Sequence, residues 1–288
     1  MRTVRTIAEL RSELSTARDV GATVGLVPTM GALHAGHVSL LSAARSECDL
    51  VVMSLFVNPT QFGPTEDLAA YPRDEDRDAA LATEAGVDLL FAPAVEEIYP
   101  PGFATSVVVH GVSEPLEGEH RPGHFDGVAT VVTKLLNIVA PDVAYFGQKD
   151  AQQALVIRRL AADLNLPVRI AVCPTVREPD GLARSSRNAY LSDDERARAA
   201  GLARALTRAS ELVAQGGCDS GAVIAAARAE LEAHDLDPEY LVIVDPDTLA
   251  PVARADRPVL IALAATVGSA RLIDNTIASP TPNGAKSA

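Results

Sequence analysis

The first 172 residues alternate short apolar segments with longer amphipathic ones, and this alternation restricts the fold more than any other feature of the chain. Segments such as 50–57 are rich in branched apolar side chains, which favour a fully buried strand. Segments such as 36–47 repeat their apolar residues with helical spacing. Strands that alternate with helices form βαβ units, so the sequence predicts a parallel sheet covered by helices on both faces.

The expected elements can be placed by residue number. Helices are expected at residues 6–18, 36–47, 74–85, 125–139 and 151–164, and strands at 22–27, 50–57, 88–92, 105–110, 143–146 and 168–172. Thr6 and Glu9 have the spacing of a capping box, which marks the start of the first helix. The fold class predicted is α/β, with a Rossmann-like parallel sheet domain at residues 1–175.

The pattern changes after about residue 175. A loop rich in Gly, Arg and Ser leads to a second capping-box pair, Ser192 and Glu195, and then to helices expected at 193–215 and 219–234. Strands are expected at 240–245 and 258–275. These elements predict a smaller C-terminal α+β domain at residues 176–278. Residues 279–288 consist mostly of Pro, Gly, Ser and Ala, and we expect a disordered tail.

Composition excludes several classes of protein. A chain of 288 residues with 48% apolar residues has enough apolar surface for a core without disulfides. A net charge of −13 argues against a nucleic-acid partner, which requires a basic face. The three cysteines form no C-x-x-C pair, and no apolar run is long enough to span a bilayer. We expect no membrane association and a reducing, cytoplasmic location.

The connection after the first long strand reads PTMGALHAGH, residues 28–37. It contains neither G-x-G-x-x-G nor a Walker sequence. His34 and His37 flank Gly36, and a helix that begins near Gly36 has its positive end there. Imidazole donors at that end suit phosphate oxygens and the charge that develops at phosphorus. A metal pair and ordinary surface histidines remain open alternatives, although no third clustered ligand supports zinc.

A second turn suited to phosphate follows a later strand and reads FGQKDAQQ, residues 146–153. Gly147 permits close approach to the backbone, and Lys149 supplies a mobile positive charge. Asp150 is suited either to accept a hydrogen bond from a ribose hydroxyl or to cap the next helix. Gln153, one helical turn further on, is expected to face the same site.

The third candidate segment is the loop EPDGLARSSRNAYL, residues 178–191. It holds the hydroxyls of Ser185 and Ser186 between Arg184 and Arg187. Such a loop is able to close over a triphosphate and bring several donors to it. A solvated linker between domains is the alternative interpretation.

Six blocks together resemble the signature sequences of the pantothenate synthetase family. They are PTMGALHAGH, SLFVNPTQFG (54–63), YPR (71–73), EGEHRPGHFDGV (117–128), FGQKDAQQ and PTVREPDGLARSSRNAYL (174–191). They stand in the family's order, and beyond residue 200 the resemblance weakens. The H-x-G-H element alone is shared with the wider nucleotidyltransferase superfamily, which includes class I aminoacyl-tRNA synthetases.

The resemblance implies a ligase that condenses (R)-pantoate with β-alanine at the expense of ATP and Mg²⁺, through a pantoyl adenylate, releasing AMP and pyrophosphate. It also implies a homodimer and does not give the direct Mg²⁺ ligands. The implied ATP site comprises Met30, Gly31, Ala32, Leu33, His34, Ala35, Gly36, His37, Gly147, Gln148, Lys149, Asp150, Val176, Arg184, Ser185, Ser186 and Arg187.

Roles within that site also follow from the resemblance. His37 is the residue that the family uses as a proton donor, with His34 and Lys149 as its catalytic neighbours. The pantoate site comprises Gln61, Gln153 and Asn58, and a supporting role falls to Arg121 and His124.

Two positions depart from the family pattern, since Arg184 replaces a usual methionine and Gln148 a commoner glutamate. An additional guanidinium near the phosphates is expected to tighten ATP binding or slow pyrophosphate release. Two rival functions remain. One is a nucleotidyltransferase that stops after nucleotide transfer, and the other is a non-catalytic nucleotide-binding regulator. The glutamine pair argues against the first, and the joint presence of His34, His37 and Lys149 argues against the second.

Overall fold

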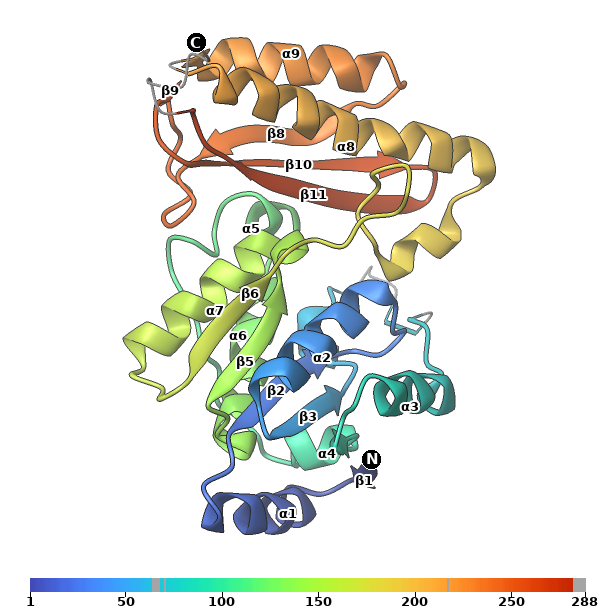
Figure 1. Cartoon of the computed structure of the whole chain (residues 1–288), viewed down its shortest axis with the longest axis vertical. Helices are drawn as coiled ribbons and strands as arrows, with labels where there is room; N and C mark the ends of the chain where they lie inside the picture. Colours follow the sequence, from blue (N-terminus) through green and yellow to red (C-terminus); the bar gives the residue numbers. More distant parts are fainter. Residues whose placement is uncertain (64–67, 70, 217, 282–288) are drawn as a thin grey trace. The chain divides into compact units, whose positions relative to one another are not determined.

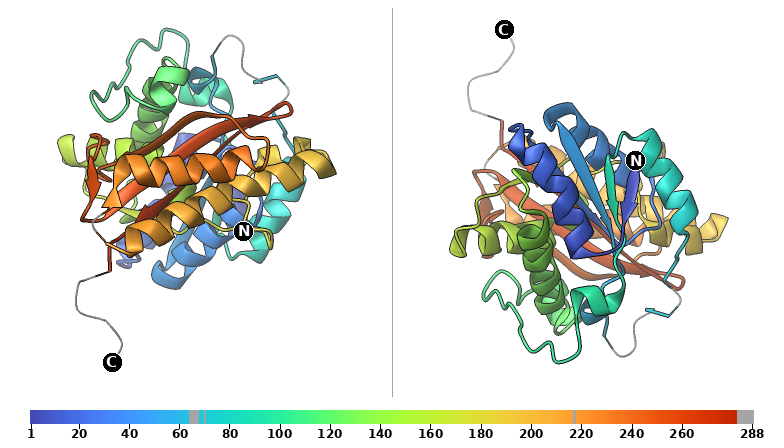
Figure 2. Two further views of the ribbon diagram at one scale, coloured as in Figure 1. Left: turned by 90° about the horizontal axis from the view of Figure 1, so that it is seen from above. Right: turned by 90° about the horizontal axis from the view of Figure 1, so that it is seen from below.

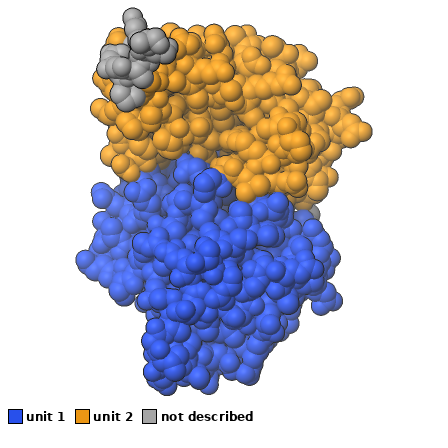
Figure 3. All heavy atoms as spheres, in the orientation of Figure 1, with its two compact units in different colours: residues 1–174 blue, residues 175–288 orange. Residues whose placement is uncertain are grey.

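The protein is represented by a computed structural model that describes residues 1–63, 68–69, 71–216 and 218–281. The chain divides into two compact units, Met1–Pro174 and Thr175–Ala288 (Figure 3). The first unit ends one residue short of the domain boundary expected from the sequence. The tail expected at 279–288 lies outside the described residues from residue 282 on.

Unit 1 is built on a six-stranded sheet in the order β1-β4-β3-β2-β5-β6 (Figure 1). Every pairing in it is parallel, which confirms the predicted Rossmann-like α/β fold. The strands are β1 (Arg2–Val4), β2 (Val24–Thr29), β3 (Leu50–Leu55), β4 (Leu89–Phe91), β5 (Val143–Gly147) and β6 (Arg169–Cys173). The short edge strand β1 was not expected, because three residues carry no readable periodicity.

Helices cover both faces of this sheet. The main ones are α1 (Ile7–Asp19), α2 (Ala35–Glu47), α3 (Glu75–Glu84), α6 (His124–Val139) and α7 (Ala151–Asp163), with the short helices α4 (Val95–Ile98) and α5 (Glu117–His120). Side chains of α1, α6 and α7 share one buried core with Leu26 and Val52. Side chains of α2 and α3 share another with the neighbouring residues Val27 and Met53. Burial on both faces explains the unbroken apolar runs of these strands.

Unit 2 packs two helices on an antiparallel sheet with the order β11-β10-β8. Helices α8 (Asp193–Ala214) and α9 (Ser220–Glu232) lie side by side (Figures 1 and 2). The strands are β8 (Pro238–Val244), β10 (Val259–Val267) and β11 (Ala270–Ala278), with a separate ribbon of β7 (Cys218–Asp219) and β9 (Arg254–Ala255). The segment 258–275 is therefore a hairpin, which turns at Gly268 with a φ of +59°.

Both predicted capping boxes are present. Thr6 and Glu9 exchange hydrogen bonds at the start of α1. Ser192 and Glu195 do the same at the start of α8. These reciprocal contacts satisfy backbone N–H groups that a helix leaves unpaired at its first turn.

The strand expected at residues 105–110 is wrong. That segment is irregular, and most of it is exposed. Its one buried residue is Val109, and the N–H group of Val107 donates to the hydroxyl of Thr130 on α6 at 2.9 Å. Branched side chains favour a strand only where a neighbouring strand takes up the backbone hydrogen bonds. Here a helix side chain takes one of them instead.

Strand β2 lies at the point where the strand order reverses. The chain continues from β2 to β3 on one side, whereas β5 pairs with the other side of β2 at Gly25 and Leu26. In open parallel sheets, ligands bind at the carboxyl ends of strands next to such a switch point. The carboxyl ends of β2 and β5 lead directly into residues 30–37 and 147–150, the two turns singled out by the sequence.

Candidate active site

The turn between β2 and α2 depends on two residues with left-handed backbone conformation, Gly31 (φ +86°) and Ala32 (φ +51°). A Cβ atom at Gly31 would lie 2.8 Å from both Asp78 Oδ2 and Leu55 Cδ1. Glycine is therefore required here for conformation and for space. Leu33, next in the turn, is only 1% exposed and packs into the core formed with α2 and α3.

Asp78 on α3 anchors this turn, and it is the residue that sequence reasoning missed. Its carboxylate is 1% exposed. Its two oxygens accept the N–H groups of Ala32 and Leu33, each at 2.8 Å. Asp78 and Ala82 are one helical turn apart and are the buried residues of α3. An acidic residue on the apolar face of a helix is the signal that could have revealed it, because such a group is rarely buried unpaired.

His34 and His37 form the capping pair of α2. His34 is the N-cap residue, and its backbone N–H donates to His37 Nδ1 at 3.4 Å. The N–H of Gly36 donates to His34 Nδ1 at 3.1 Å. The two rings lie with their centroids 4.2 Å apart. Because each Nδ1 accepts a hydrogen bond, each neutral ring carries its proton on Nε2.

Burial, followed by the charge of His34, lowers the pKa of His37 to about 3. Two smaller effects follow: Asp150 raises the pKa of His37 and so opposes the shift, and Lys149 lowers it further. His37 is therefore neutral at physiological pH, and its Nε2–H group is a hydrogen-bond donor rather than a charged acid. The influence of Lys149 and Asp150 also indicates that the turn after β5 lies near the histidine pair.

That second turn contains the 3₁₀ helix Gln148–Asp150. Lys149 Nζ lies 3.4 Å from Asp150 Oδ1, and the lysine side chain is 18% exposed. Asp150 is the N-cap residue of α7, as one of the two interpretations expected, but its side chain makes no capping hydrogen bond. A Cβ atom at Gly147 would meet no described atom within 4 Å. Packing among the described residues therefore does not require glycine at this position.

The amides of Asn58 and Gln61 lie together beside the first turn. Asn58 Nδ2 donates to Gln61 Oε1 at 3.1 Å, and Gln61 Nε2 donates to the thioether of Met30 at 3.0 Å. Both amides are buried. Sulfur in a thioether is a weak acceptor. The Gln61 donor is therefore poorly satisfied by the protein, unlike most buried amides. Gln153, the other glutamine expected here, is partly buried in the first turn of α7.

Arg121 and His124 support Gln61 from the backbone side. Arg121 Nη1 lies 3.1 Å from His124 Nε2, and His124 Nδ1 lies 2.9 Å from the Gln61 carbonyl oxygen. A guanidinium only donates, so Nε2 accepts and Nδ1–H donates to that carbonyl. A Cβ atom at Gly127 would lie 2.4 Å from the Thr60 carbonyl oxygen, so glycine is needed for this close packing.

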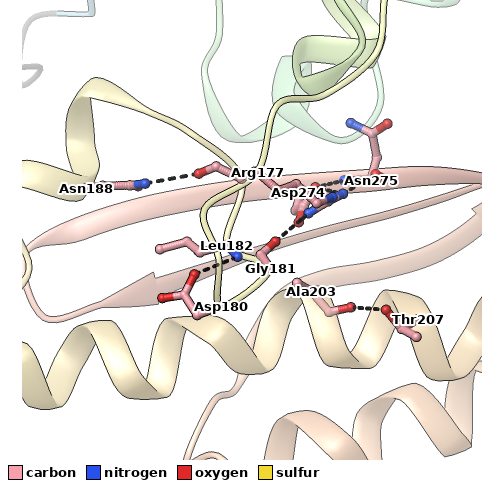
Figure 4. A network of polar contacts seen from close by, with 10 residues as sticks. Arg177, Asp180, Gly181, Leu182, Asn188, Ala203, Thr207, Asp274 and Asn275 are labelled. Atoms are coloured by element: carbon pink, nitrogen blue, oxygen red, sulfur yellow. Dashed lines mark hydrogen bonds and ion pairs between the residues drawn. The ribbon is translucent and has the colours of Figure 1, made fainter. Parts of the chain in front are cut away.

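In unit 2, the loop 175–191 is anchored at its base (Figure 4). Arg177 donates to both oxygens of Asp274 on β11, at 2.6 and 3.0 Å, and Asp274 is 1% exposed. Val176 O accepts the N–H of Arg184 at 2.9 Å. Asn188 Nδ2 donates to Ala183 O at 3.0 Å. These contacts give the loop a fixed local structure, which a solvated linker would lack.

Directly after the bridge between Arg177 and Ala183, Arg184 forms an ion pair with Glu178 at 2.8 Å. Ser185 caps the 3₁₀ helix Ser186–Tyr190 by accepting the N–H of Arg187 at 3.3 Å. Sequence reasoning led us to expect an additional positive charge at Arg184. In the structure, a carboxylate of the same loop neutralises much of that charge.

Comparison with known proteins decides the family. The family model for pantoate-beta-alanine ligase matches residues 2–277. The chain belongs to the pantoate–β-alanine ligase family. A pantothenate synthetase from Moorella thermoacetica is 55% identical over 278 residues, which cover 96% of this chain and 98% of that protein.

Solved structures agree. The crystal structure of pantothenate synthetase from Thermus thermophilus has 51% sequence identity and a TM-score of 0.92, covering 97% of this chain and 100% of that one. The Francisella tularensis pantoate-beta-alanine ligase, complexed with beta-gamma ATP and beta-alanine, has 34% identity and a TM-score of 0.81, covering 96% and 97%. This chain is therefore an enzyme of the amide-forming ligase class.

Neither a metal-binding cluster nor a membrane-spanning helix occurs in the described part of the chain. Among residues 1–63, 68–69, 71–216 and 218–281, no three His, Cys, Asp or Glu side chains form a group suited to a metal ion. Over the same ranges, no helix is both long and apolar enough to cross a membrane.

Proposed function

We propose that this ligase joins (R)-pantoate to β-alanine and cleaves ATP to AMP and pyrophosphate through a pantoyl adenylate. The observation that carries the proposal is the histidine capping pair at the switch point of the sheet, close to Lys149 and Asp150. The beta-gamma ATP and beta-alanine in the Francisella tularensis ligase support both substrates.

In the first step, a carboxylate oxygen of pantoate bonds to the α-phosphorus of ATP, and the bond from that phosphorus to pyrophosphate breaks. His34 and His37 donate through Nε2 to the oxygens on which charge develops. Lys149 has a long, mobile side chain, so its positive charge can stay close to the pyrophosphate while that group leaves. Mg²⁺ enters with the nucleotide as MgATP.

The remaining ATP contacts are assigned by the same proposal. Ser185, Ser186 and Arg187 contribute donors from the loop of unit 2. Asp150, whose carboxylate lies 3.4 Å from Lys149 Nζ, accepts from the ribose. Gly147 admits the nucleotide close to the backbone, because no described atom occupies the position of its missing side chain. Arg184 contributes little, since it is paired with Glu178.

Pantoate is held by Gln61 and Gln153. Neutral amides bind the hydroxyl and carboxylate oxygens of pantoate without neutralising the attacking carboxylate. The poorly satisfied Nε2–H group of Gln61 supports this assignment, because a substrate oxygen is a far better acceptor than the Met30 sulfur.

In the second step, the neutral amine of β-alanine attacks the acyl carbon of the adenylate. The C–N bond forms, the bond from the acyl carbon to the AMP oxygen breaks, and the nitrogen loses a proton to solvent. Holding the two reactants in contact supplies most of the acceleration of this step.

The test is to measure pyrophosphate and AMP release from MgATP, with pantoate alone and then with β-alanine. We expect pyrophosphate with pantoate alone and AMP only after the amine is added. Lys149→Ala should lose both products. Arg159→Ala removes a cation that is 61% exposed on α7, and it should leave both products unchanged. ATP binding without turnover would favour the non-catalytic regulator, and pyrophosphate release with no AMP release after β-alanine is added would favour the nucleotidyltransferase.

The proposal extends to a cytoplasmic homodimer, which the family resemblance alone supports. Light scattering after size-exclusion chromatography measures the assembly. A mass of one chain, near 30.1 kDa, would contradict it.

A further inference from the structure

A hydrogen-bonded chain leads to Gln61 from a residue that the proposed mechanism does not use. It begins at Tyr99, which follows α4 and is partly buried. The Tyr99 hydroxyl donates to Asn58 Oδ1 at 2.8 Å. Burial raises the pKa of Tyr99, with a smaller opposing effect from Thr60. The phenol therefore keeps its proton and remains a donor at any pH used for an assay.

Asn58 is fixed in one orientation. Its oxygen accepts from Tyr99 and also from the hydroxyl and N–H of Thr60, at 3.0 and 3.4 Å. Its nitrogen donates to Gln61 Oε1 and to the Gly127 carbonyl, both at 3.1 Å. The Thr60 N–H only donates and the Gly127 carbonyl only accepts, so a flipped amide would place donor against donor and acceptor against acceptor. The Tyr99 hydroxyl adds the shortest of the contacts that hold this orientation, at 2.8 Å. With 1% of its surface exposed, Asn58 has no hydrogen-bonding group left for a substrate.

The orientation of Asn58 determines that of Gln61. Asn58 Nδ2 donates a hydrogen bond to Gln61 Oε1, so the Gln61 amide nitrogen is the atom that points toward Met30. The sulfur holds it weakly. Gln61 therefore offers an N–H donor, and not a carbonyl acceptor, to whatever replaces the thioether.

We propose that Tyr99 is a positioning residue that sets the polarity of the Gln61 amide through Asn58, and that Asn58 acts as a relay rather than a substrate contact. Gln61 then binds an acceptor oxygen of the hydroxy acid. This inference rests on the proposed function in its assignment of Gln61 to pantoate. It replaces the direct substrate role that the family resemblance implies for Asn58.

The surroundings of Tyr99 provide a matched control. Its ring packs against Phe103 with centroids 5.1 Å apart, and Lys134 Nζ lies 4.6 Å from the Phe103 centroid. Phe103 is 37% exposed and has no hydroxyl. Tyr99→Phe removes only the first donor of the relay, whereas Phe103→Leu disturbs the packing of the same ring and leaves the relay intact.

The experiment measures kcat and KM for pantoate and for ATP, together with Tm, in Tyr99→Phe, Phe103→Leu and the unsubstituted enzyme. Loss of one hydrogen bond between neutral groups should raise the KM for pantoate about fivefold in Tyr99→Phe, with the KM for ATP unchanged. Phe103→Leu should leave both KM values unchanged. An unchanged pantoate KM in Tyr99→Phe overturns the proposal, as does an equal rise in both KM values with a fall in Tm, which marks a purely structural role.

A measurement that needs no turnover separates this inference from the proposed function. The side-chain ¹⁵N–¹H signals of Asn58 and Gln61, assigned by Asn58→Ala and Gln61→Ala, should both shift in Tyr99→Phe and remain in place in Phe103→Leu. If both signals shift but the unsubstituted enzyme does not use pantoate, the relay stands and the proposed function fails. If neither signal shifts, the relay itself is wrong.

Discussion

The turn at residues 30–37 and the loop at residues 175–191 were expected to serve the same nucleotide, but they are held in different ways. The turn is fixed by neutral or backbone contacts and by the buried carboxylate of Asp78. The loop is fixed by ion pairs, one with the buried Asp274 and one between Arg184 and Glu178. The first arrangement leaves both histidine rings with a defined tautomer. In the second, the positive charges of the loop are paired with carboxylates, one on β11 and one within the loop itself.

This difference separates catalysis from stability. Donors that are already oriented need no reorganisation when charge develops in the transition state, so loosening the turn should reduce the rate. An ion pair with one buried member is costly to break, so loosening the base of the loop should reduce stability. Ion pairs between exposed side chains contribute little to either the rate or the stability. Four predictions test this contrast, beginning with the largest effect.

Arg177→Met should lower the free energy of unfolding by about 3–5 kcal/mol, because it leaves the Asp274 carboxylate buried and unpaired. Chemical denaturation measures this loss. Arg257→Met is the control, since Arg257 is 60% exposed and lies 3.5 Å from Asp245. Equal losses in the two variants would contradict the buried anchor. Adding Asp274→Asn to Arg177→Met should restore part of the stability.

Asp78→Asn should reduce kcat/KM for ATP roughly 10- to 100-fold, which corresponds to about 1–3 kcal/mol for an unsatisfied buried group. One carboxylate oxygen becomes an N–H₂ group that faces a backbone N–H. Asp76→Asn, at an exposed position on the same helix, should have no effect. Asp78→Glu should recover part of the activity if the acceptor matters. A fall in Tm with unchanged kinetics at low temperature would assign Asp78 to stability alone.

The free energy of unfolding should decrease as the pH is lowered below about 6.5, the ordinary pKa of histidine. His37 has its pKa lowered to about 3 in the folded protein, so between these values the unfolded chain binds a proton that the folded chain does not. The free energy of unfolding then decreases by up to about 1.4 kcal/mol per pH unit as the pH falls. His37→Gln should flatten this slope in urea titrations. Parallel slopes would show that His37 titrates normally.

Arg184→Met should have the smallest effect. Arg184 is 38% exposed and is paired with Glu178, so its removal should change the KM for ATP by less than about fivefold, in keeping with a partly exposed pair. Rapid-quench measurement of pyrophosphate release should likewise change little. A larger change in either quantity would mean that Arg184 leaves Glu178 to contact the nucleotide.

Sequence reasoning succeeded where local pattern and tertiary environment agree. The strand at 50–57 and the helix at 36–47 were predicted within two residues of β3 and α2, because each buries the face that its periodicity marks. It failed at residues 105–110, where a strand-like pattern has no neighbouring strand. It also placed Asp150 as a possible cap; Asp150 does stand at the N-cap position of α7, and only the structure shows that its side chain makes no capping hydrogen bond.

Periodicity, caps and motifs are local properties of the chain, and they were enough to establish the parallel α/β architecture, the two capping boxes and the segments that carry the family's signature residues. The folded arrangement was needed to show that Asp78 holds the first turn, that His37 is neutral, and that Tyr99 leads through Asn58 to Gln61. Each of these findings depends on contacts between side chains that are distant in the sequence, or on burial. Burial removes water, so a charge or an amide must find its partner within the protein.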